Sequence, residues 1–227
     1  MASRISLTYD GGFVSHRELV LPRLHEPRIP ATFFIDPVSL VEHSQTWHQA
    51  RQDGHEIGNG SLVTAALPSG LLPGWNHDMV LGEIVESQEA FLELMGSEPE
   101  AFAYPWGLPE VEQGGDYRPI VRPRFMWARS GQEFWNDEQT LDPQYLGCLR
   151  VEGTDTQLAL TYLDKAVERG AWAILSFAGV GDGELSCDAR VHEGVLQHLV
   201  TELAVVPVVT ISQGVRSLAT RENVLRF

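Results

Sequence analysis

The sequence predicts an α/β fold whose parallel sheet closes, or nearly closes, into a barrel. Short apolar runs bounded by Gly, Pro or Asp alternate with longer helical patterns. Such alternation implies parallel strands joined by right-handed crossovers. Seven strand-like runs suit a barrel, and an open doubly wound sheet is the alternative. No Gly-x-Gly-x-x-Gly follows the first run, which disfavours a dinucleotide-binding version of that sheet.

The expected strands are apolar runs too short for helices. They span residues 5–8, 31–35, 56–58, 101–104, 124–128, 171–177 and 205–210. The segment 129–146 lacks periodicity and is expected to be a long loop.

The expected helices carry end signals. They are 38–53 before Gly54, 77–95 after Asn76, the run from a capping box at Thr154 to Gly170, and the run after Asp188.

Composition narrows the class of protein. The 227 residues are expected to form a single domain, 1–227, and 43% hydrophobic residues suffice for its core. A net charge of -15 disfavours nucleic acid and anionic membranes as partners. Cys148 and Cys187 show no metal-site spacing and are expected to be core or loop thiols. The absence of an apolar leader predicts a cytoplasmic protein.

Polar and aromatic residues follow several predicted strands. Asp10 follows the first, Asp36 the second and Asn59 the third, and 104–107 and 177–179 follow later ones. In a barrel these carboxyl ends meet on one face, where active sites lie. Each residue also has an ordinary structural interpretation. Asp10 suits a turn before two glycines. Asn59 and Ser61 suit a helix cap or hydrogen bonds to the loop backbone, and His55 lies at the opposite strand end.

Several other polar or aromatic residues have structural roles as their first interpretation. Trp106, Trp127 and Trp135 could stack on sugar rings, but core packing or loop anchoring is the favoured interpretation of each. Asp182 and Glu184 suit a solvated acidic turn.

Five segments resemble the motifs of one enzyme family. They are LTYDGG at 7–12, RIPATFFI at 28–35, GHEIGNGS at 54–61, FAYPWG at 102–107 and AILSFAGVG at 173–181. In order and spacing they are similar to those of the polysaccharide deacetylases, carbohydrate esterase family 4, which share the NodB-homology domain. The resemblance covers nearly the whole chain. It implies a deformed (β/α)7 barrel and hydrolysis of N- or O-acetyl groups on carbohydrate.

The resemblance also assigns residues. Asp10 matches the catalytic base of the family. Substrate-binding positions are those beside the metal ligands and in the groove-lining motifs, namely Asn59, Ser61, Tyr104, Pro105, Trp106 and Phe177.

The departures from the family pattern are as informative as the matches. Gly11, Gly60 and Thr64 stand where the family has the Asp and two His that hold zinc, cobalt or nickel. Ala103 stands where an Arg usually orients the base, although the branch that this chain resembles often lacks that Arg too. Ala178, or Phe177 if the register shifts by one, replaces the general-acid His. We therefore expect no bound metal.

Loss of the metal has a large chemical cost. Zinc lowers the pKa of bound water from about 15.7 to about 7, which corresponds to at most about 12 kcal/mol. A carboxylate is a feeble base for free water.

Three functions remain open. The first is a degenerate deacetylase that still binds an oligosaccharide or another small ligand around Asp10. The second is a metal-independent amide hydrolase with Asp10 as base and Asp36, Asp182 or His77 recruited from nearby loops. The third is an interaction or scaffold protein. The retained motifs favour the first.

Overall fold

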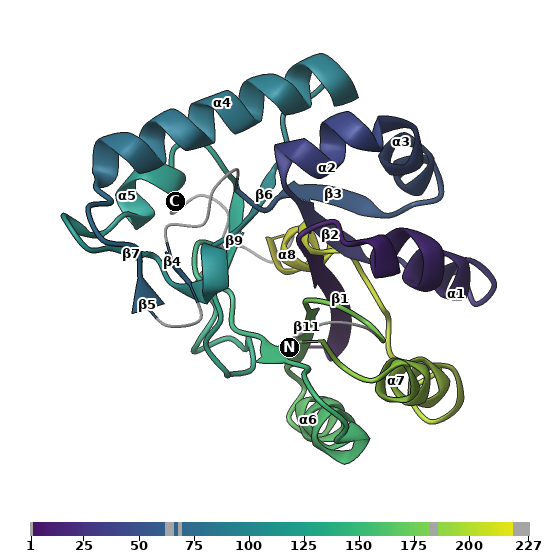
Figure 1. Ribbon diagram of the computed structural model, residues 1–227. Helices are drawn as coiled ribbons and strands as arrows, with labels where there is room; N and C mark the ends of the chain where they lie inside the picture. Colours follow the sequence, from purple (N-terminus) through teal and green to yellow (C-terminus); the bar gives the residue numbers. More distant parts are fainter. Residues whose placement is uncertain (1, 62–65, 68–69, 182–185, 220–227) are drawn as a thin grey trace.

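The computed structural model describes residues 2–61, 66–67, 70–181 and 186–219. Seven parallel strands form one curled sheet in the order β10-β11-β1-β2-β3-β6-β9 (Figure 1). The strands are β1 (Arg4–Asp10), β2 (Thr32–Ile35), β3 (Glu56–Asn59), β6 (Ala101–Ala103), β9 (Trp127–Arg129), β10 (Leu149–Arg150) and β11 (Trp172–Phe177). The curl and its surrounding helices confirm the deformed (β/α) barrel.

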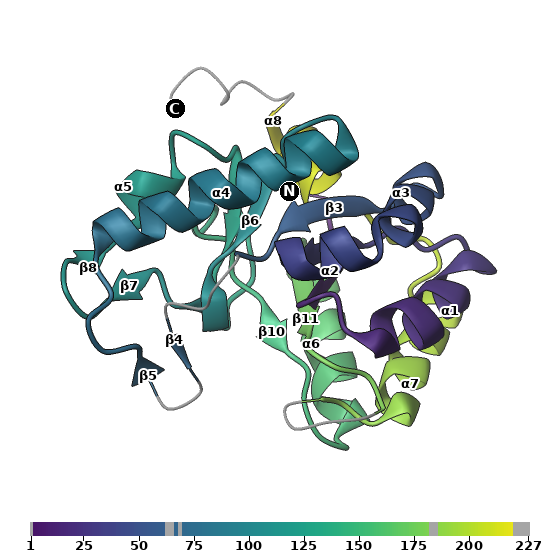
Figure 2. The ribbon, with the colours of Figure 1, turned by 45° about the horizontal axis from the view of Figure 1, so that its top comes forward.

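Helices surround this sheet (Figures 1 and 2). They are the π-helix η1 (His16–Val20), α1 (Leu21–His25), α2 (Pro37–Glu42), α3 (Ser44–Gln52), α4 (His77–Met95), α5 (Arg118–Val121), α6 (Thr156–Glu168), α7 (Ala189–Thr201) and α8 (Ile211–Ala219). A single 3-10 turn, η2 (Pro105–Gly107), follows β6. Two small hairpins, β4 (Ala66–Leu67) with β5 (Gly70–Leu71) and β7 (Glu110–Val111) with β8 (Gly115–Asp116), complete the described secondary structure. Among the described residues, no helix has the length and apolar character needed to cross a bilayer.

Side-chain alternation along β1 separates the two faces of the sheet. Ile5, Leu7 and Tyr9 face outward into the large core shared with α1, α6 and α7. The alternate residues, which include Ser6 and Thr8, face the barrel interior. Thus Asp10, the last residue of β1, lies on the interior face at the carboxyl end of its strand.

Helix α8 covers the opposite, amino-terminal end of the barrel. The side chain of Glu56 accepts a hydrogen bond from the Ser212 backbone N–H at 3.0 Å, and Thr32 Oγ1 accepts one from Ile211 N at 3.0 Å. Arg4 Nη1 donates to the Gly214 carbonyl at 2.8 Å. A carboxylate at a helix N-terminus is stabilising. Because α8 occupies this end, the carboxyl ends of the strands form the accessible mouth.

Some sequence expectations need correction. Residues 205–210 are not a strand, and only Val208 bridges Ile5, because Pro207 lacks an N–H and Thr210 turns the chain into α8. The seventh strand is instead β10, inside a stretch with no strand signal.

Helix boundaries differ from the expectations in two places. The helix expected at 38–53 is two helices separated at His43, whose φ of -133° is not helical. Asp155, rather than Thr154, caps α6 by accepting from Leu158 N. The expected caps Asn76 and Asp188 are confirmed.

Two buried histidines beside Tyr9 predict acid sensitivity. Burial lowers the pKa of His16 to about 4 and that of His192 to about 3. The unfolded chain, with histidine pKa values near about 6.5, binds more protons below that pH. Stability is therefore full above pH 6.5 and falls as the pH drops from about 6.5 toward 4 and then 3, by about 3 kcal/mol for His16 alone.

This expectation can be checked by urea unfolding at pH 7, 5.5 and 4.5. His192→Gln keeps a partner for the Tyr9 hydroxyl, which lies 2.8 Å from His192 Nε2, and removes the titration. We expect its stability to depend less steeply on pH than that of the wild type. His25→Gln makes the same substitution at an exposed site and serves as the matched control. Equal slopes in the wild type and His192→Gln would contradict the prediction.

Candidate functional site

The mouth of the barrel is organised around an ion pair between β1 and β9. Arg129 Nη2 donates to both carboxylate oxygens of Asp10, at 2.6 and 2.5 Å. Ser176 Oγ, from β11, donates to Asp10 Oδ2 at 2.9 Å. Arg129 is 3% exposed and Asp10 35% exposed, so the carboxylate is reached from solvent while its cation is not. The expected position of Asp10 at the mouth agrees with this structure.

The Arg129 guanidinium is held from several sides. Its Nη1 donates to the Ser130 carbonyl at 3.2 Å and to Cys148 Sγ at 3.3 Å, and its carbon lies 5.3 Å from the centre of the Phe34 ring. Burial alone would lower the pKa of Arg129, but Asp10 and Cys148 together more than offset this effect, and the pKa is raised. Burial raises the pKa of the Cys148 thiol, which makes Cys148 a packing residue rather than a nucleophile.

A second group at the mouth combines an aromatic ring and a cation. Trp106 has φ 53°, a left-handed conformation that is uncommon for a bulky residue and costs about 1–3 kcal/mol. The Arg150 guanidinium lies 5.4 Å from the centre of its ring and pairs with Glu152 at 2.6 Å. Arg150 is in register with Ser176, the partner of Asp10. Sequence reasoning missed Arg150 because β10 carried no strand signal.

Asn59 and Ser61 lie at the end of β3 with their polar groups directed into the protein. Asn59 Oδ1 accepts from Ser61 N at 2.7 Å, and Ser61 Oγ donates to Glu83 Oε1 at 2.8 Å. Both residues are buried, and Ser61 has φ 73°. These contacts fit the structural interpretation of the pair, in which an Asx turn stabilises the loop backbone.

Three other expected substrate-binding residues are buried. Tyr104 packs between Phe102 and Tyr117, and its hydroxyl donates to the Gln144 carbonyl at 3.1 Å. Pro105 is buried in η2, and Phe177 stacks on Tyr9 in the outer core. The structure therefore does not bring these side chains to Asp10, because strand alternation directs Phe177 outward and an aromatic cluster holds Tyr104.

Comparison with known proteins indicates the family of this chain. Residues 2–113 match the sequence profile described as "Polysaccharide deacetylase". The chain belongs to the polysaccharide deacetylase family. No curated protein matches the sequence. Identity and function beyond the family therefore rest on the site itself.

Solved structures of this family share the fold. A putative polysaccharide deacetylase from Mycobacterium smegmatis is 14% identical, with a TM-score of 0.67 over 97% of this chain and 91% of that one. A mutant of the peptidoglycan deacetylase PdaC from Bacillus subtilis is 18% identical, with a TM-score of 0.61 over 96% and 93%. A carbohydrate esterase family 4 pseudoenzyme from Bacillus anthracis is 14% identical, with a TM-score of 0.61 over 93% and 65%.

The metal-ligand positions of the deacetylase family do not fit a metal here. Gly11 has φ 98° and donates its N–H to the Phe34 carbonyl at 2.8 Å. A Cβ at Gly60 would lie 2.8 Å from the Phe34 carbonyl oxygen, so the backbone itself fills that space. Thr64 lies outside the described residues. Within the described part of the chain, no three His, Cys, Asp or Glu side chains form a possible metal site.

Arg129 lies on the strand next to the position where the family pattern has the arginine that orients the base. Ala103 stands at the family position, and Arg129 is the residue directly beside it on the neighbouring strand. A cation thus reaches Asp10 from β9 rather than from β6. The strand predicted at 124–128 ends one residue before β9 does, so the prediction places Arg129 in a loop. The sequence feature that could have identified Arg129 is its position directly after the apolar run 125–128.

The general-acid position has also changed its role. The carbonyl of Ala178 forms a short hydrogen bond with His16 Nε2, and Ala178 offers no titratable side chain. Of the residues suggested for a rewired site, Asp36 is engaged elsewhere and His77 lies at the start of a helix. Asp36 caps α2 by accepting from Ser39 N at 2.7 Å, and His77 begins α4. Asp182 and Glu184 lie outside the described residues.

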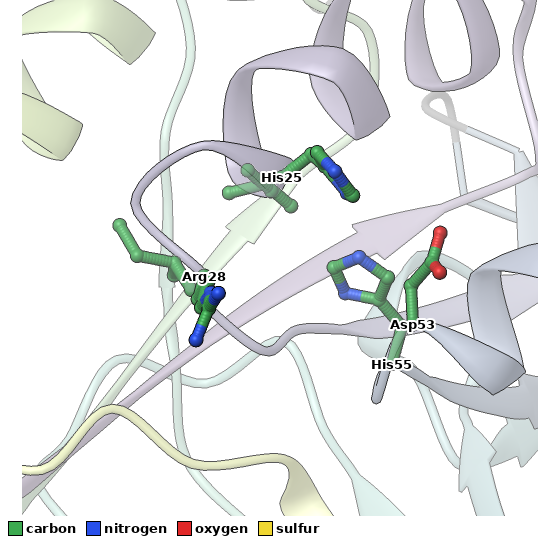
Figure 3. A pocket seen from close by; sticks show the side chains of 6 residues that line it. His25, Arg28, Asp53 and His55 are labelled. Carbon is green, nitrogen blue, oxygen red and sulfur yellow. The ribbon is translucent and has the colours of Figure 1, made fainter.

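A pocket of about 240 Å³ lies at the other end of β2 and β3 (Figure 3). It is lined by Leu24, His25, Arg28, Ile29, Asp53 and His55. His55 Nδ1 accepts from the Ala31 N–H at 3.2 Å, which confirms the expected structural role of His55. Since these residues precede β2 and β3, the pocket is separate from the mouth that contains Asp10.

Proposed function

We propose that this chain is a deacetylase-like protein that binds an oligosaccharide at the barrel mouth without metal-dependent hydrolysis. The observation that carries the proposal is the packing at Gly60, where the Phe34 backbone occupies the space of a metal-ligand side chain. The change at Gly11 and the absence of a general acid at Ala178 support it.

The surroundings of Asp10 support the same proposal. Asp10 matches the catalytic base of the family, and both its oxygens accept from Arg129. Without a metal to make water acidic, a carboxylate is a weak base for that water. It remains suited to accept a hydrogen bond from a sugar hydroxyl, because its exposed side faces solvent.

Metal content and sugar binding together test this proposal. Protein incubated with zinc, cobalt or nickel and then desalted should retain well under one metal per chain by mass spectrometry. Calorimetry with chitin, xylan and peptidoglycan fragments should show binding to at least one of them. Retention of one metal per chain, or no heat with any fragment, would overturn the proposal. Hydrolysis that survives a chelator would instead support the metal-independent amide hydrolase.

A further inference from the structure

An exposed aromatic side chain lies three residues after Asp10, with its ring over Gly11. Phe13 is 49% exposed, although it stands in the short turn that links β1 to η1. A single exposed aromatic residue is ordinary on a protein surface, so the case for Phe13 rests on its position and not on its exposure. Sequence reasoning passed over Phe13 because a lone aromatic residue in a loop gives no pattern.

The turn that carries Phe13 is held in place. The Gly12 carbonyl accepts from Arg17 Nη1 at 2.7 Å and from Ser39 Oγ at 3.1 Å. The Phe13 carbonyl accepts from His16 N at 3.0 Å, and the two rings meet edge to face with centroids 5.5 Å apart. These hydrogen bonds hold the backbone of the turn, so a ligand that bound there would need to order little of that backbone.

The Phe13 ring also covers Gly11. A Cβ built on Gly11 would lie 3.0 Å from two carbons of the ring. A side chain at residue 11 would press on the ring, which would have to shift to make room for it. The first metal-ligand position of the family is therefore an apolar surface in this chain, next to the single retained carboxylate.

The hydrogen bonds of Asp10 leave room for a ligand. A carboxylate has about four acceptor positions. Arg129 uses one on each oxygen and Ser176 uses a second on Oδ2, so one position on Oδ1 is left. Only Gly11 and Gly12 separate Asp10 from Phe13 along the chain, and the Phe13 ring lies over Gly11.

We propose that Phe13 is a stacking platform for a neutral pyranose ring whose edge hydroxyl donates to Asp10. A pyranose has an apolar C–H face and polar edges, which matches an aromatic face beside a carboxylate. Val38 and Val41 on α2 are also exposed, and a protein partner that covered them would be the competing use of this surface. We favour the stacking platform over the protein partner because a bound sugar would use both Phe13 and Asp10, whereas a partner on Val38 and Val41 would not need Asp10. The inference rests on the proposed function.

The test compares Phe13 variants in calorimetry with chitin and xylan tetramers. Phe13→Ala should weaken the affinity at least about tenfold, equivalent to about 1.4 kcal/mol, whereas Phe13→Trp should bind as well as the wild type. Val38→Thr with Val41→Thr should leave the affinity unchanged. Circular dichroism melting identifies any variant that fails to fold. If Phe13→Ala does not fold, Phe13→Leu takes its place, because it keeps an apolar side chain at this half-exposed site and removes the aromatic ring.

The outcomes separate the two proposals. Equal affinity in Phe13→Ala and the wild type would overturn the platform and leave the proposed function standing. Equal losses in Phe13→Ala and the α2 double variant would overturn the platform in favour of a broad apolar interface. No binding by the wild type would overturn the proposed function and the platform together.

Discussion

Replacement of Asp10 by Asn is expected to lower the free energy of unfolding by about 3–5 kcal/mol, an effect much larger than is usual at a half-exposed site. The reason is Arg129, which is 3% exposed and has no other carboxylate among its described partners. Asn keeps a hydrogen-bond acceptor but removes the compensating charge. Urea unfolding at pH 7 measures the change.

Matched variants show whether the cost arises from a stranded cation. Arg129→Met removes the buried charge and leaves Asp10 with Ser176 and solvent, so it should cost less than Asp10→Asn. The double variant should be more stable than the sum of the single changes predicts, with a coupling free energy of about 1–3 kcal/mol. A loss below about 1 kcal/mol in Asp10→Asn would contradict this account.

This stability effect changes how activity data must be interpreted. Loss of binding or turnover in Asp10→Asn has chemical meaning only when the folded fraction is known. Ser176→Ala is a milder probe, because it removes one neutral hydrogen bond to Asp10 Oδ2 and leaves the ion pair in place.

The sequence predicted the end of the barrel that carries the site, because strand periodicity alone places Asp10 and Asn59 at carboxyl ends. It could not predict which side chains meet there. The contact between Asp10 and Arg129 joins residues 119 positions apart, and it depends on how far the sheet curls. A one-residue error in the boundary of β9 was enough to move Arg129 out of the sheet.

The same limits apply to the residues that do not face the mouth. Tyr104 and Phe177 lie in motifs that match the family, but their directions follow from local packing that a motif does not encode. Phe13 shows the reverse situation. Its importance arises from the ring's position over Gly11 and from its exposure, and both are properties of the folded turn.

Restoring the family's metal ligands is expected to fail in this chain. In Gly60→His the new Cβ would lie 2.8 Å from the Phe34 carbonyl oxygen, and a backbone atom cannot move aside cheaply. In Gly11→Asp the backbone would keep a φ of 98°, and the Cβ would press on the Phe13 ring. Each change should cost about 1–3 kcal/mol of stability. Combined with Thr64→His, they should still yield well under one zinc per chain.

Two control variants separate crowding from other effects of the same substitutions. Gly82→His places the same side chain on α4, where a new Cβ meets no atom within 4 Å, and should cost far less than Gly60→His. Gly54→Asp has a φ of 96° with open space around it, so it isolates the backbone strain of Gly11→Asp. Adding Phe13→Ala to Gly11→Asp should recover part of its loss.

Urea midpoints and metal content by mass spectrometry decide the matter. One zinc per chain in the triple variant, without loss of stability, would mean that the backbone at Gly11 and Gly60 adapts freely. Only the three side chains at positions 11, 60 and 64 would then stand between this chain and a metal site. If the variants are destabilised and bind no zinc, the backbone around Gly11 and Gly60 also prevents metal binding. The packing of Phe34 against Gly60 and of Phe13 over Gly11 then separates this chain from a metal-dependent deacetylase by more than its ligands.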